Sequence, residues 1–130
     1  MKDANLTIMI IVLSLIKTSM DISSTDYKDC YNEHPRVFLT LFLHAFIAVF
    51  SYLGCFYNNR NILIFYIVSH IVVPVHWLLN DNKCILSVSV NEICGFDINR
   101  RYLTLSKGTI NLYILKIICF FIAIYRLRKM

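Results

Sequence analysis

The feature of this sequence that most limits its fold is a series of four long apolar blocks separated by polar segments. Roughly 20 helical residues are needed to cross the ~30 Å hydrocarbon core of a bilayer, and helices satisfy their own backbone polar groups there. The pattern therefore predicts an all-α fold, an integral membrane bundle of four transmembrane helices that forms a single multi-span domain over residues 1–130. The expected spans are about 6–20, 37–57, 62–79 and 109–125.

The composition agrees with a membrane protein. Of the 130 residues, 58% are hydrophobic and 16% are charged, which leaves too few polar side chains to cover the core of a soluble domain. The net charge of +5 comes from basic residues that stand singly at the ends of blocks or in the tail Arg126–Lys129. Because this distribution is typical of a cytoplasmic flank, it predicts no nucleic-acid partner and places both termini in the cytoplasm.

Two interpretations fit the first apolar block. As a signal peptide, it has a short hydrophobic region, with only Lys2 beside Asp3 in front of it and no Ala-x-Ala site behind it. As a membrane helix, it needs Lys17 to extend its aliphatic stem to the lipid headgroups. The flanking residues favour the membrane helix.

The second and third blocks are separated by a very short connection. Residues 58–61 are long enough only for a tight hairpin. The blocks 37–57 and 62–79 are therefore expected to lie antiparallel and in contact with each other.

The other two connections are long and polar. Residues 21–35 are predicted to be a solvated loop, after which the run from His34 to Arg36 marks the start of a helix. Within the connection 80–107, the apolar stretch 85–90 fits either a short interfacial helix or a strand.

Histidines are the first candidates for chemistry. Residues whose numbers add to about 120 lie at similar depth in the two arms of the predicted hairpin, and His44 and His76 satisfy that relation. Imidazoles on facing helices hold haem between axial ligands or bind a transition metal. The residues predicted for haem are His44, His76 and His70, and those predicted for a metal ion are His44, His76 and Cys84. In the alternative interpretation, these imidazoles only form hydrogen bonds between helices.

Cysteines suggest a second kind of chemistry. Cys30, Cys84 and Cys94 all lie in the two long polar connections, on the same side of the predicted bundle. If that side is oxidising, Cys84 and Cys94 form a disulfide, or Cys30 pairs with either of them. The chain has no Cys-x-x-Cys motif, so the pattern favours a structural bridge or free thiols over a thiol oxidoreductase.

Lys116 lies inside the last apolar block, and no block contains an acidic residue to pair with it. An intramembrane charge is a functional candidate by default. The interpretations are substrate binding, a contact between subunits, and extension of the side chain to the interface.

Several short motifs together resemble a known family. The order Leu43-His44, Gly54, His70, Cys84-Ile85-Leu86-Ser87 and Glu92 is similar to that of short four-span membrane proteins catalogued as a domain of unknown function. That family has Leu-His, Gly, His and then Cys-Pro-Leu-Thr, with a glutamate soon after, so Ile85 and Ser87 depart from its pattern. The resemblance implies a four-helix membrane bundle with a polar site near the long connections. It implies no activity.

These features together predict a small multi-pass membrane protein that is not an enzyme. It is expected to act through helix packing as a structural or membrane-assembly component. Its expected partners are the lipid bilayer and either a second copy of the chain or other membrane proteins. One alternative is a haem- or metal-dependent redox protein using His44 and His76. The other is a small oligomeric channel or carrier.

Overall fold

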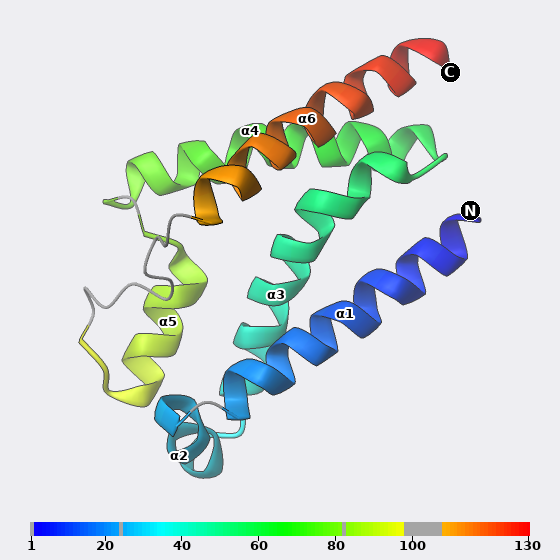
Figure 1. The fold of residues 1–130 in the computed structure, drawn as a ribbon. Helices are drawn as coiled ribbons and strands as arrows, with labels where there is room; N and C mark the ends of the chain where they lie inside the picture. The colour runs from blue at the N-terminus through cyan, green and yellow to red at the C-terminus, as the bar shows by residue number, and fades with distance from the viewer. Residues whose placement is uncertain (1, 24, 82, 98–107) are drawn as a thin grey trace.

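The computed structural model describes residues 2–23, 25–81, 83–97 and 108–130. These residues form six α-helices, one short 3₁₀ helix and no strand, which confirms the all-α prediction. Residues 98–107 of the predicted polar connection lie outside the described residues. The elements are α1 (Asp3–Ser23), α2 (Thr25–Glu33), α3 (Val37–Leu53), η1 (Gly54–Phe56), α4 (Arg60–Leu79), α5 (Ile85–Cys94) and α6 (Gly108–Lys129) (Figure 1).

Three helices in the described part of the chain are long and apolar enough to cross a membrane. They are α1, the continuous stretch Val37–Phe56 and α4. The first, Asp3–Ser23, extends beyond the predicted range 6–20 at both ends, and near its C-terminal end Lys17 donates to the Asp21 carboxylate at 2.7 Å. Lys17 therefore has an acidic partner on its own helix. A fourth span stays a prediction.

Two helices occupy segments in which a loop or an undecided element was expected. The loop prediction for residues 21–35 is wrong, because α2 fills most of that segment. Residues 85–90, for which either a helix or a strand was expected, belong to the helix α5. This helix stops at Gly95, whose φ of 67° suits glycine, and Phe96 N–H closes the end by donating to the Asn91 carbonyl at 2.8 Å.

The helices do not pair as the hairpin prediction states. α3 packs along α1, and α4 packs along α6. α3 and α4 diverge from the turn that joins them (Figure 1), and they touch close to it, where Tyr66 Oη donates to the Ser51 carbonyl at 2.8 Å. α3 and α4 diverge because η1 and the extended residue Tyr57 change the direction of the chain between them. The predicted contact between these helices is therefore present near the turn, but they do not pack as an antiparallel pair.

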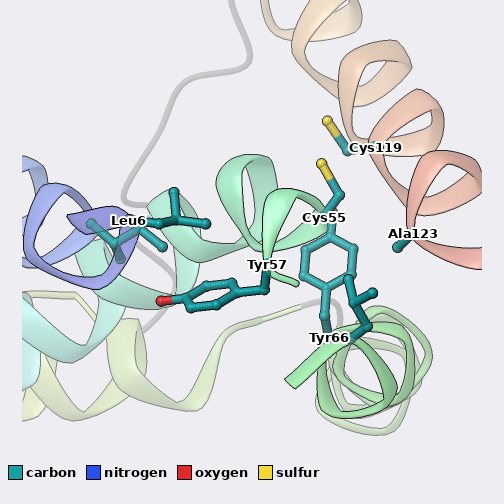
Figure 2. Packing of buried hydrophobic residues seen from close by; sticks show 8 residues of the cluster. Leu6, Cys55, Tyr57, Tyr66, Cys119 and Ala123 are labelled. Atoms are coloured by element: carbon teal, nitrogen blue, oxygen red, sulfur yellow. The ribbon is translucent and has the colours of Figure 1, made fainter. Parts of the chain in front are cut away.

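One apolar core lies where α1, η1, α4 and α6 meet. Figure 2 shows Cys55 and Tyr57 from the η1 region between Leu6 of α1 on one side and Cys119 and Ala123 of α6 on the other. We call this core the termini-end cluster. Its members are Leu6, Ile10, Cys55, Tyr57, Leu63, Tyr66, Cys119 and Ala123.

Polar contacts tie both chain termini to the α3–α4 turn at this end. Asp3 accepts hydrogen bonds from the backbone and side-chain nitrogens of Asn58 at 2.9 and 3.2 Å. Arg126 donates to Asn58 Oδ1 at 2.7 Å and to the Cys55 carbonyl at 3.1 Å. The N-terminus, the turn and the end of α6 therefore lie on the same side of the molecule (Figure 1).

A second core lies at the other end of α3, against α2 and α5. We call it the disulfide-end cluster, and its members are Tyr27, Cys30, Val37, Leu41 and Val90. Beside it, Cys30 of α2 and Cys94 of α5 form a disulfide with their Cα atoms 5.3 Å apart. The alternative in which Cys30 pairs with Cys94 is therefore confirmed.

The predicted Cys84–Cys94 disulfide is wrong. Cys84 is a free cysteine in the structure. It precedes α5, and Cys94 is the last residue of that helix. A ten-residue helix separates its ends by about 15 Å, far more than the roughly 7 Å between Cα atoms that a disulfide tolerates.

Candidate functional site

The candidate site is built on the tight turn that joins α4 to α5. Lys83 N–H donates to the Asn80 carbonyl at 2.8 Å, and the Asn80 side chain donates to the Lys83 carbonyl at 3.0 Å. Asp81 has a φ of 50°, in the left-handed region that Asn and Asp tolerate better than most residues. This turn changes the direction of the chain and places Cys84 at the N-cap of α5.

Two histidines from different helices reach this turn. Nδ1 of His44, on α3, lies 3.7 Å from the sulfur of Cys84. Nε2 of His76, on α4, accepts the backbone N–H of Ile85 at 3.3 Å. The structure thus places His44 and His76 in contact with two adjacent residues, Cys84 and Ile85, although α3 and α4 do not pack along each other. These contacts form because α5 packs against α3 and carries Cys84 back to it.

The Cys84 thiol is shifted toward its thiolate form. Burial raises its pKa, but the hydrogen bond with His44 and the backbone N–H groups of Ser87 and Leu86 outweigh burial and lower the pKa to about 7. Amide groups at a helix N-terminus and a nearby imidazole both favour a negative sulfur. The arrangement is therefore that of an activated, partly exposed thiol.

His44, His76 and Cys84 do not form a preformed metal site. In the parts of the chain that the structure describes, no three His, Cys, Asp or Glu side chains are grouped so that they could hold a metal ion. The His76 nitrogen is occupied by a backbone N–H, and the Cys84 sulfur and His44 imidazole bond each other. Haem binding by His44, His76 and His70 stays a prediction.

His70 lies apart from this site. Its ring packs between Tyr66 at 4.2 Å and Phe120 of α6 at 5.9 Å between centroids. Its Nδ1 lies 3.0 Å from the Tyr66 carbonyl, and its Nε2 is buried with no hydrogen-bond partner within the described residues. His70 therefore faces α6, away from the turn that holds His44 and His76.

Within the described residues, the neighbours recorded for Lys116 are aromatic rings and not carboxylates. Its Nζ lies 5.0 Å from the centre of the Tyr52 ring on α3 and 5.8 Å from that of Tyr113 on its own helix. Cation–π attraction of this kind stabilises an ammonium group that has left water. Tyr52 was not among the predicted site residues, since a tyrosine in an apolar run gives no signal that sets it apart from a packing residue.

Comparison of the chain with protein-family models, curated proteins and solved structures found no match. The resemblance to the four-span family therefore stays a prediction.

Proposed function

We propose that this protein is a small integral membrane protein with four spans that acts through helix packing, as a structural or membrane-assembly component. The observation that carries the proposal is the outward face of α4. Only 11% of its most apolar 18-residue window is buried within the chain. The large apolar side chains exposed on this helix are Ile64, Phe65, Val68, Ile71, Val72, Val75, Leu78 and Leu79. A face of this kind is suited to lipid and to the helices of partner proteins.

The fourth span of the proposal is α6. Its 22 residues measure about 33 Å at the usual helical rise, enough to cross the hydrocarbon core. The rings around Lys116 support a charged group within it. The basic residues of its last turn, Arg126, Arg128 and Lys129, suit a membrane surface.

The two ends of the molecule support one orientation. Disulfides persist in oxidising compartments, which favours a non-cytoplasmic location for the end that holds Cys30 and Cys94. Basic residues are enriched on cytoplasmic flanks, which favours the cytoplasm for the opposite end, where Asp3, Asn58 and Arg126 join both termini. The two criteria are independent and agree.

A cysteine-labelling experiment tests the span number and the orientation together. In a Cys84→Ala background, we expect an impermeant maleimide to label Lys2→Cys and Arg128→Cys in sealed vesicles whose cytoplasmic face is outward. Arg36→Cys, beside the disulfide-end cluster, should react only after detergent is added. All three positions are exposed in the structure. Labelling of one terminus without the other contradicts four spans, and labelling of Arg36→Cys alone contradicts the orientation.

A photo-crosslinking experiment tests the assembly role. A photoreactive amino acid at position 72, on the outward face of α4, is expected to form adducts with a partner protein or a second copy in native membranes. Ile16 on α1 is a matched control position, since Val72 and Ile16 are similarly exposed, at 56% and 51%. Lipid adducts alone at position 72, or the same protein adducts at both positions, would contradict an assembly surface on α4.

A further inference from the structure

The Cys84 sulfur has features that a packing cysteine does not need. It is a free thiol that is only partly buried, and it lies 3.7 Å from His44 Nδ1 at the start of α5. By contrast, the two other free cysteines, Cys55 and Cys119, are buried in the termini-end cluster. Among the free thiols of the described residues, Cys84 is therefore the one that is both partly exposed and hydrogen-bonded to an imidazole.

The charged and titratable groups around Cys84 come from each segment that meets there. α3 contributes His44, which bonds the sulfur, and α4 contributes His76, which bonds the next backbone N–H. The turn itself carries Asp81 and Lys83. Of these groups, His44 lowers the pKa of the Cys84 thiol, through a hydrogen bond and through its charge.

No cysteine in the described residues is placed to pair with Cys84 inside the same molecule. Cys94 is already bonded to Cys30, at the far end of α5. Cys55 and Cys119 lie in the other core. A sulfur partner for Cys84 must therefore come from another molecule.

We propose that Cys84 is a modification site that exchanges with a small external disulfide, assisted by His44. In the reaction, the Cys84 sulfur attacks one sulfur of the disulfide, a new sulfur–sulfur bond forms, and the original one breaks. The proton of the Cys84 thiol passes to His44 Nδ1 and then to the leaving thiolate. Cys84 is oxidised to a mixed disulfide and one half of the external disulfide is reduced to a thiol, so atoms and electrons balance. A small disulfide is preferred because the sulfur is partly buried in a turn.

Glutathione disulfide is a suitable probe for the purified full-length protein in detergent. We expect one glutathionyl group per chain, located by peptide mapping at Cys84, and none in Cys84→Ser. His44 acts as a positioning residue, so its role is tested with His44→Gln, which keeps a polar side chain of similar reach. The intact Cys30–Cys94 bond and an unchanged elution volume serve as folding controls.

The pH dependence of the exchange rate distinguishes activation by His44 from a structural role. Wild-type Cys84 has a pKa of about 7, whereas an unassisted thiol has a pKa of about 8.5 or above when buried. At pH 7 the wild type has more thiolate and is expected to react roughly threefold faster than His44→Gln. Near pH 9.5 both are ionised, and the more basic thiolate of the variant is expected to react about fivefold faster.

The order of the two rates is therefore expected to reverse between pH 7 and about 9.5. Parallel pH profiles in the wild type and His44→Gln would overturn the role of His44. A Cys84 thiol that stays unmodified while a free-thiol peptide reacts would overturn the modification site. Neither result depends on the number of spans or on a partner at α4.

Discussion

Replacing Gly54 by alanine is expected to destabilise the fold by about 3 kcal/mol, because the site has no room for a methyl group. A Cβ atom at this position would overlap Tyr66 Cδ2 and lie 2.8 Å from Tyr66 Cε2 and 3.0 Å from Phe50 Cε2. Tyr66 is fully buried in the termini-end cluster, so its ring can move only by displacing other core side chains. Thermal unfolding in detergent, followed by circular dichroism, measures the effect.

Two further variants show whether steric overlap is the cause. Gly95→Ala tests a glycine with open space around it and a φ of 67°, so only backbone strain applies and the expected cost is about 1 kcal/mol. In a Tyr66→Leu background, the additional cost of Gly54→Ala should fall below about 1 kcal/mol, because the ring that it meets is gone. An undiminished cost in that background would show that the overlap with Tyr66 is not the reason.

Removing the Cys30–Cys94 disulfide is expected to lower the free energy of unfolding by about 4 kcal/mol. The bond joins residues 64 positions apart, and closing a loop of that length restricts the unfolded chain by about this amount. It also holds α2 to α5 beside the disulfide-end cluster. The double variant Cys30→Ala/Cys94→Ala and reduction of the wild type should lower the melting temperature by similar amounts.

The free thiol at the same end of the molecule provides the control. Cys84→Ser leaves the disulfide in place and should change the free energy of unfolding by less than about 1 kcal/mol. Reductant should have no further effect on the double variant. A wild-type protein whose melting temperature does not change on reduction would contradict a stabilising role for this bond.

The candidate site forms around α5 and not along a hairpin of α3 and α4. His44 and His76 were expected at similar depth in the two arms of a hairpin formed by α3 and α4. They do reach one turn, yet through α5, which packs on α3 and places Cys84 against His44. The apolar stretch that became α5 was too short for its periodicity to separate helix from strand. Its direction, and hence the Cys84–His44 contact, could not be read from the sequence.

The disulfide partner of Cys94 was also decided by the tertiary structure. Cys84 and Cys94 lie in the same predicted polar connection, ten positions apart, and were one of the possible pairs. Once the segment between them is helical, its rise holds them apart, and α2 brings Cys30 to Cys94 instead. A disulfide partner is a property of Cα positions in space, which the spacing along the chain does not report.

The sequence by itself determined the helical class and the places where most long helices begin and end. Long apolar runs that cross lipid satisfy their backbone hydrogen bonds as helices, and the polar segments between these runs set the ends. Only the tertiary structure decided that α1 pairs with α3, that α4 pairs with α6 and that Cys30 pairs with Cys94. The physical reason is that an apolar side chain facing lipid and one facing another helix have the same hydropathy, whereas helix pairing depends on how the side chains fit together in space.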